Sequence, residues 1–167
     1  MKKVVVLGIG NILLNDEGIG VVVLQELQKR FYFDESVELV DGGTGGLLLL
    51  QFIEEAEKLL VIDAITCGGK PGTIYKFNAK EIPEEVVEKI SMHEVSFIDI
   101  LNLCKIRNKL PSEVVIIGVE PKSLEMEGRL SKEVKAKIPE LIDEVISQLK
   151  EWNVKVKEVN PQRAQGS

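Results

Sequence analysis

Carboxylate side chains follow three separate apolar runs of this sequence, and such groups can bind metal ions or act as general acids and bases. Asp16 and Glu17 come after the first run and a glycine-rich turn, whereas Asp41 and Asp63 directly end the second and third runs. Asp63 follows a run that we expect to be buried on both faces, and a buried carboxylate requires a partner. The sequence therefore predicts a cluster of carboxylates where these runs end.

Each candidate residue also has a plainer interpretation. Asp16 can cap a helix, and Glu17 can complement the helix dipole. Asp41, which precedes two glycines, can form an ordinary Asx-type turn. His93 is the only histidine, so any imidazole chemistry passes through it, but a lone histidine is more often a surface or capping residue. Cys67 is either a small apolar filler or a thiol nucleophile paired with His93.

The common nucleotide-binding and hydrolase motifs are absent from the sequence. Gly8 and Gly10 suggest a dinucleotide fingerprint, but the third glycine is replaced by Leu13. The run Gly68-Gly69-Lys70 lacks the spacing of a phosphate-binding loop, and no serine lies in a Gly-x-Ser-x-Gly elbow. The carboxylates must therefore be interpreted without help from these motifs.

Short apolar runs rich in β-branched residues predict strands buried on both faces. These runs are Val4–Leu7, Val37–Val40, Leu59–Ile62 and Val114–Ile117. Residues 73–77 alternate in polarity and predict a further strand at an edge. Helical periods separate these segments, in residues 19–31, 46–55, 94–107 and 134–149. Ser131 is a candidate N-cap for the last helix, which Pro139 should kink or restart.

The alternation of strands and helices predicts an α/β fold. We expect a three-layer αβα sandwich with a mostly parallel, twisted sheet of about five strands. The length of 167 residues fits one domain, predicted for residues 1–159, with a polar and mobile tail at 160–167. In such a sheet ligands bind beyond the carboxyl ends of the strands, where the predicted carboxylates gather.

Composition and charge exclude several functions. A net charge of -6 repels phosphate backbones and anionic lipids, so neither nucleic acid nor a membrane is an expected partner. The apolar runs are far shorter than the roughly 20 residues of a membrane span. Two well-separated cysteines suit free thiols in a reducing compartment, and we expect a cytoplasmic protein.

Five sequence blocks resemble the maturation endopeptidases of nickel-iron hydrogenases. The blocks are Gly8–Gly20, Asp41–Thr44, Asp63-Ala64, Ser91–Glu94 and Gly118–Pro121, and they keep the order and approximate spacing of that family. The first two blocks together are highly specific, and the similarity covers about residues 3 to 150. The resemblance implies an endopeptidase that removes the C-terminal extension of a hydrogenase large-subunit precursor after nickel insertion, and it favours a monomer.

The resemblance also implies roles for particular residues. Glu17, Asp63 and His93 match a metal-binding set that engages nickel carried by the substrate, so no tightly held cofactor is expected. Asp41, Gly42, Gly43 and Thr44 match a loop associated with substrate recognition and catalysis. Two carboxylates and an imidazole suit nickel, zinc or cadmium and leave positions open for water or substrate.

Several mechanisms remain open at this stage. The metal can activate water directly, or a carboxylate such as Asp63 or Asp41 can act as general base. The alternatives to a metal- or carboxylate-dependent peptidase are a non-catalytic, nickel-dependent module that binds the precursor, and a thiol hydrolase using Cys67 and His93.

Overall fold

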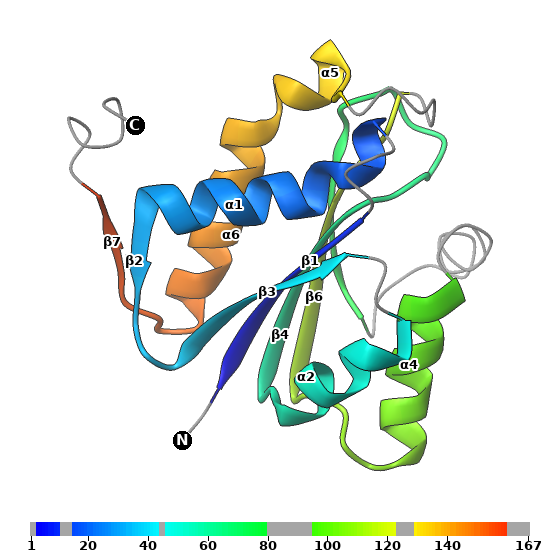
Figure 1. Ribbon diagram of the computed structural model, residues 1–167, viewed down its shortest axis with the longest axis vertical. Helices are drawn as coiled ribbons and strands as arrows, with labels where there is room; N and C mark the ends of the chain where they lie inside the picture. The colour runs from blue at the N-terminus through cyan, green and yellow to red at the C-terminus, as the bar shows by residue number, and fades with distance from the viewer. Residues whose placement is uncertain (1–2, 11–14, 44–45, 80–94, 123–128, 160–167) are drawn as a thin grey trace.

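A five-stranded sheet lies at the centre of the molecule, with helices on both faces (Figure 1). The computed structural model describes residues 3–10, 15–43, 46–79, 95–122 and 129–159. The sheet has the order β3-β1-β4-β6-β5. Its strands are β1 (Val4–Ile9), β3 (Val37–Gly43), β4 (Lys58–Ala64), β5 (Ile74–Asn78) and β6 (Glu113–Val119). All neighbouring pairs are parallel except β5 and β6, so the predicted α/β fold with a mostly parallel sheet and a further strand at its edge is confirmed.

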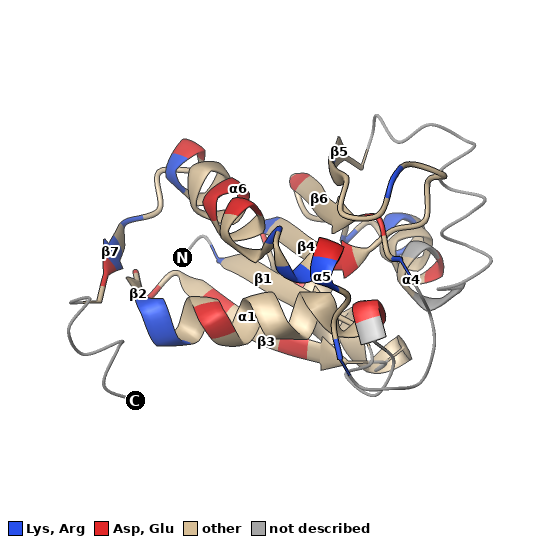
Figure 2. Ribbon diagram, turned by 90° about the horizontal axis from the view of Figure 1, so that it is seen from above, with Lys and Arg blue, Asp and Glu red and all other residues tan. Residues whose placement is uncertain are grey.

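The two faces of the sheet have different coverings. One face packs against α1 (Ile19–Arg30), α5 (Lys132–Lys135) and α6 (Ile138–Glu151). The other face packs against α2 (Leu49–Glu55) and α4 (Val95–Ile106). Seen from above, α1 and α6 lie to one side of the sheet and α4 to the other (Figure 2). The strands are buried because alternate side chains enter one core or the other.

The longest helical prediction is partly corrected by the structure. Ser131 does cap a helix, because its hydroxyl oxygen accepts a hydrogen bond from the Val134 N–H at 3.3 Å. That helix is only α5, however, and α6 begins separately at Ile138 with Pro139 in its first turn. Proline fits the first turn because its missing N–H is not needed there. The predicted restart at Pro139 is therefore correct.

A second, small sheet was not predicted. β2 (Phe31–Phe33) pairs antiparallel with β7 (Val156–Glu158), near the end of the described chain. Phe31, expected as the last apolar residue of a helix, instead begins β2, and α1 ends at Arg30. The remaining elements are two short 3-10 helices, η1 (Asn15–Gly18) and η2 (Gly46–Leu48), at the carboxyl edge of the main sheet.

Trp152 closes the opposite, amino edge of the sheet. Its buried indole N–H donates a hydrogen bond to Glu113, the first residue of β6. The Lys58 ammonium, at the start of β4, lies 5.7 Å from the centroid of the tryptophan ring. Both partners begin strands, so the end of α6 is fixed at the edge farthest from the carboxylates. Within the described ranges, the helices are all too short or too polar to cross a membrane.

Candidate functional site

The strand order reverses at the carboxyl ends of β1 and β4. From β1 the chain passes to β3 on one side, and then crosses to β4 on the other side of β1. In open α/β sheets the crevice at this reversal is the usual ligand site. Glu17, in η1, follows β1, and Asp63 is the penultimate residue of β4. The fold therefore places both carboxylates at its most favourable position for a ligand.

Glycines allow η1 to pack directly against the strand ends. Gly10 has φ +136°, and a Cβ atom there would lie 1.7 Å from the carbonyl oxygen of Glu17. A Cβ on Gly20 would lie 2.2 Å from the carbonyl oxygen of Ile62, which immediately precedes Asp63. Larger residues would push the chain apart at both points. The glycines thus hold the backbones of Glu17 and Asp63 close to the same strand ends.

Asp63 and Glu17 differ in burial. Asp63 is only 6% exposed, and its Oδ1 accepts a hydrogen bond from the Ala64 N–H at 2.8 Å. Glu17 is half-buried, and η1 contacts β4. One shielded and one partly exposed carboxylate can hold a cation presented from outside, or activate a water molecule.

Asp16 does not cap a helix. Helix α1 begins after Gly18 without a side-chain cap, while the Asp16 side chain is completely buried. Its carboxylate accepts hydrogen bonds from the N–H groups of Lys122 and Ser131, both at 2.7 Å, and from the Ser131 hydroxyl at 2.9 Å. Asp16 thereby joins η1 to two chain positions more than 100 residues away, and fixes the element that contains Glu17.

Glu120 has a similar position on the other flank of the edge. It follows β6 and is 3% exposed. Its Oε1 accepts hydrogen bonds from the Cys67 N–H at 2.9 Å, the Gly69 N–H at 2.7 Å and the Tyr75 hydroxyl at 3.0 Å. Glu120 therefore anchors the connection that leaves β4 just after Asp63.

The Glu120 contact affects the ionisation of Tyr75. Burial and the hydrogen bond to the Glu120 carboxylate together raise the pKa of Tyr75 to about 12. Burial disfavours the charged phenolate, and a neighbouring carboxylate repels it. Tyr75 consequently remains a hydrogen-bond donor to Glu120 at neutral pH.

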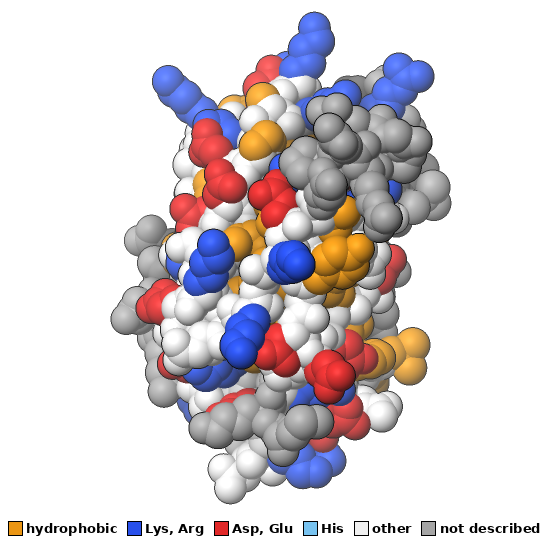
Figure 3. Space-filling model, turned by 90° about the vertical axis from the view of Figure 1, so that its left-hand side faces the viewer, with side chains coloured by type: hydrophobic (Ala, Val, Ile, Leu, Met, Phe, Trp, Pro, Cys, Tyr) orange, Lys and Arg blue, Asp and Glu red, His pale blue; other side chains and the backbone are white. Residues whose placement is uncertain are grey.

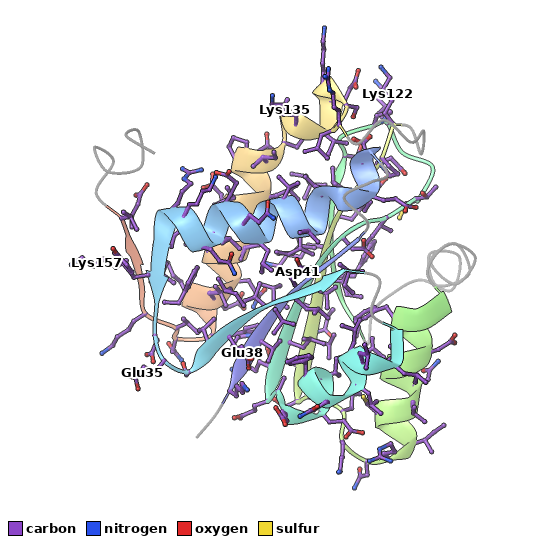
Figure 4. The ribbon with its side chains drawn as sticks, in the orientation of Figure 1. Glu35, Glu38, Asp41, Lys122, Lys135 and Lys157 are labelled. Atoms are coloured by element: carbon purple, nitrogen blue, oxygen red, sulfur yellow. The ribbon has the colours of Figure 1, made fainter. Side chains whose placement is uncertain are left out.

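Asp41 begins the second glycine-rich segment. Its Oδ1 accepts a hydrogen bond from the Gly43 N–H at 3.0 Å, the Asx-type arrangement considered above, while the side chain stays exposed on β3 (Figure 4). Gly43 has φ +46°, and a Cβ on Gly42 would lie 2.9 Å from Leu7 Cδ1. Asp41 thus fixes the carboxyl end of β3, where Gly42 packs against Leu7 and Leu49 and the proposed substrate loop begins.

The structure separates Asp41 from Asp63. Asp41 and Ile62 are both level with Gly8 of β1, on opposite sides of that strand. Two strand spacings therefore place the two aspartate backbones about 10 Å apart. Asp63 is one residue beyond Ile62, so the alternation of side chains directs it to the other face of the sheet from Asp41. Glu17 lies in η1, which contacts β4, the strand that contains Asp63.

Two of the predicted site residues, His93 and Thr44, lie outside the described residues. Among the residues that the structure does describe, no group of three or more His, Cys, Asp or Glu side chains is arranged to hold a metal ion. The described chain therefore supplies two carboxylates of the predicted set, and the third member is the histidine at position 93.

The structural roles of Asp16 and Glu120 were not predicted. Asp16 was interpreted as a cap, and Glu120 was only part of a resembling block. The available signal was the presence of carboxylates beside buried strand ends, where each requires hydrogen-bond donors. The donors themselves are distant in sequence, so no local pattern names them.

Comparisons with known proteins identify the family. The family model described as hydrogenase maturation protease matches residues 21–148. The hydrogenase expression/formation protein HupD of Bradyrhizobium diazoefficiens is 37% identical over 157 residues, 93% of this chain and 82% of that protein. The hydrogenase 2 maturation protease of Escherichia coli is 35% identical over 153 residues, 91% of this chain and 93% of that protein.

A solved structure gives the same result. The hydrogenase maturating endopeptidase HybD from Escherichia coli superposes with a TM-score of 0.87 at 34% identity, over 93% of this chain and 97% of that chain. Fold and sequence together define a peptidase. This chain belongs to the hydrogenase maturation protease family, which favours catalysis over the non-catalytic binding module considered above.

Proposed function

We propose that this peptidase removes the C-terminal extension of a nickel-iron hydrogenase large-subunit precursor after nickel has been inserted. The observation that supports this proposal most directly is the pair Glu17 and Asp63 at the strand-order reversal. Asp63 is nearly buried at the end of β4, and η1, which contains Glu17, contacts the same strand. Two carboxylates at the carboxyl edge of the sheet suit a borderline cation brought in by a protein substrate.

In this proposal Glu17, Asp63 and His93 bind the nickel of the loaded precursor. Binding through the metal brings the scissile peptide into the crevice only when the precursor is mature. Nickel is thus part of the substrate, and the peptidase holds no metal tightly itself. Zinc or cadmium can occupy the same oxygen and nitrogen ligands when supplied in solution.

Hydrolysis needs only water as co-reactant. The water oxygen bonds to the scissile carbonyl carbon, the C–N bond breaks, and both water protons end on the leaving amine, so the products are a carboxylate and an ammonium group and the general base is regenerated. Nickel can polarise the carbonyl or the water. For a carboxylate-assisted route we favour Asp63 over Asp41 as general base, because Asp63 is shielded at the end of β4 whereas Asp41 is exposed and points to the other face of the sheet.

The loop that begins at Asp41 is proposed to bind the substrate backbone. Gly43 has no side chain, which favours the close approach of a peptide backbone, whereas Gly42 is buried against Leu7 and Leu49. Thr44 continues this loop in the sequence. Asp41 fixes the geometry of the loop, and substitution there should weaken substrate binding more than it slows the chemical step.

A mass-spectrometric cleavage assay tests the proposal. Large-subunit precursor, with and without nickel, is incubated with wild-type protein, Asp63→Asn, His93→Gln and the matched control Asp143→Asn, an exposed aspartate on α6. We expect cleavage of only the loaded precursor. Loss of a group that acts in acid–base or metal chemistry should slow cleavage at least about 100-fold, whereas Asp143→Asn should behave as wild type.

Three results would count against parts of the proposal. Equal cleavage of loaded and unloaded precursor would exclude nickel recognition. Full activity of both Asp63→Asn and His93→Gln would exclude the assigned site. Inactivation by Cys67→Ser, with circular dichroism unchanged, would instead support the thiol mechanism.

A further inference from the structure

Exposed apolar side chains are concentrated on one part of the surface. Among the described residues five large hydrophobic side chains are exposed, and four of them belong to this region. They are Leu47 (72% exposed) and Leu48 (78%) in η2, Ile106 (81%) at the end of α4, and Leu110 (37%) just after it. We call these four residues the Leu47 patch. The fifth, Tyr32, lies on β2 across the molecule.

Two open grooves run beside the Leu47 patch. The first, of about 740 Å³, is lined by Leu47, Leu48 and Leu110 together with residues of α2. The second, of about 480 Å³, lies between Leu47 and the α4 residues Leu103 and Ile106. The four side chains therefore form a continuous apolar surface with hollows on both sides of Leu47.

The charges that border the first groove pair with one another. Glu54 accepts a hydrogen bond from Arg107 at 2.6 Å and lies 3.9 Å from the Lys109 ammonium. Glu55 lies 3.7 Å from the ammonium of Lys3. A partner gains little from these charges and more from burying the leucine and isoleucine side chains.

The opposite face of the molecule differs. Figure 3 shows that on the face that contains β2 and β7 the apolar areas are interspersed with Lys, Arg, Asp and Glu side chains. Clusters of exposed apolar side chains usually mark interaction sites, whereas single ones need no explanation. The Leu47 patch is a cluster, and Tyr32 is a single residue.

The position of the patch indicates its partner. η2 begins three residues after Gly43, where β3 and the proposed substrate loop meet. Leu47 is the sixth residue after Asp41, so the two lie at most about 22 Å apart. A protein bound at the Asp41 loop is therefore within reach of the patch.

The size of the patch argues against a dimer. Four aliphatic side chains expose a few hundred Å², whereas a stable interface buries about 800 Å² on each partner. The patch alone is too small to hold a second copy of this chain. It has the size expected of one part of a larger interface that also includes the neighbouring substrate loop.

We infer that the Leu47 patch is a docking surface for the hydrogenase large-subunit precursor, which it contacts through apolar side chains that begin beside the proposed substrate loop and extend to the end of α4. This inference rests on the proposed function, because it takes the precursor as the substrate. Docking at the patch adds binding energy away from the scissile bond, so it selects the whole folded precursor over a short peptide.

The test compares the double variant Leu47→Ser/Leu48→Ser with the control Tyr32→Ser, using full-length, nickel-loaded precursor. Both variants replace exposed side chains, so circular dichroism and thermal unfolding should match wild type. The double variant should raise KM at least tenfold with little change in kcat, since the loss is of binding rather than chemistry. Tyr32→Ser should leave both constants unchanged.

The same assay separates the two proposals. If wild type cleaves the precursor but the KM of the double variant stays within twofold, the docking surface is wrong and the proposed function stands. If wild type does not cleave the loaded precursor, both fail. Sedimentation showing a wild-type dimer that the double variant dissociates, with KM unchanged, would assign the patch to self-association and overturn the inference.

Discussion

Two regions border the carboxyl edge of the sheet: η1, which follows β1, and the connection that leaves β4. Each region, called a flank below, is held by a buried carboxylate, but the hydrogen-bond donors differ. On the first flank Asp16 accepts bonds from two backbone N–H groups and the Ser131 hydroxyl. On the second, Glu120 accepts bonds from two backbone N–H groups and the Tyr75 phenol. Asp16 neighbours Glu17 in sequence, whereas Glu120 anchors the connection after Asp63. Each proposed nickel-binding carboxylate therefore has its own support.

Because the donors differ, substitution of Asp16 and substitution of Glu120 should have different effects on the stability of the fold. Asp16 joins segments 106 and 115 residues apart, and Lys122 and α5 lie together at that end of the molecule (Figure 4). Glu120 joins segments only 45 to 53 residues apart. Loss of Asp16 should disturb more of the fold, while only the Glu120 flank includes a donor that ionises.

The largest effect is expected for Asp16→Ala. It leaves two backbone N–H groups and a hydroxyl buried without their acceptor, which should lower the free energy of unfolding by about 3–5 kcal/mol. Asp16→Asn, which keeps one acceptor oxygen, should cost less. Urea unfolding followed by circular dichroism measures both. A loss below about 1 kcal/mol for Asp16→Ala would show that this flank is not held by the carboxylate.

A smaller effect is expected for Glu120→Gln. The glutamine Oε1 can still accept the three bonds that converge on one oxygen, so the free energy of unfolding should fall by only about 1 kcal/mol. Glu120→Ala removes the acceptor and should cost about 2–4 kcal/mol. Urea titrations of the two variants give the comparison. Equal losses in both would mean that the negative charge, rather than the acceptor oxygen, stabilises this flank.

The smallest effect at neutral pH is expected for Tyr75→Phe, which removes one hydrogen bond worth about 1 kcal/mol. Its signature lies at high pH. Because the pKa of Tyr75 is raised from 10.0 to about 12 in the folded state, the unfolded chain loses this proton first. The contribution of Tyr75 to stability is therefore full below pH 10 and declines as the pH rises toward 12.

Two measurements check the tyrosine prediction. Absorbance titration near 295 nm should show a phenol ionising near pH 12 in wild type and none there in Tyr75→Phe. The difference in unfolding free energy between the two proteins should shrink between pH 10 and 12. If this difference stays constant between pH 10 and 12, the ionisation of Tyr75 does not affect the free energy of unfolding, and the prediction is wrong.

The sequence predicted most of the main sheet because burial on both faces leaves a strong local pattern. Runs such as Leu59–Ile62 contain only apolar residues and were assigned correctly to strands. The regular apolar stripe of α6 was equally clear. In contrast, β2 and β7 have three residues each, and they pair across most of the chain length, so neither has a periodicity to detect.

The location of the candidate site could be predicted from the sequence, but the hydrogen bonds that position its residues could not. The rule for carboxyl strand ends pointed to Asp16, Glu17, Asp41 and Asp63 alike, and only the family resemblance singled out Glu17, Asp63 and His93. Asp16 accepts hydrogen bonds from Lys122 and Ser131 rather than from the first turn of its own helix. These donors are distant in sequence, and only the folded chain brings them near. The separation of Asp41 from Asp63 likewise depends on strand order, which the residue types alone do not encode.

Trp152 provides a built-in optical reporter. It is the only tryptophan of the chain, and its contacts with Glu113 and Lys58 lie at the edge of the sheet opposite the carboxylates. Its fluorescence therefore follows the global folding transition with little contribution from events at the crevice. A metal ion that binds among Glu17 and Asp63 is remote from this indole, so unfolding can be followed by tryptophan fluorescence in the presence of the metal.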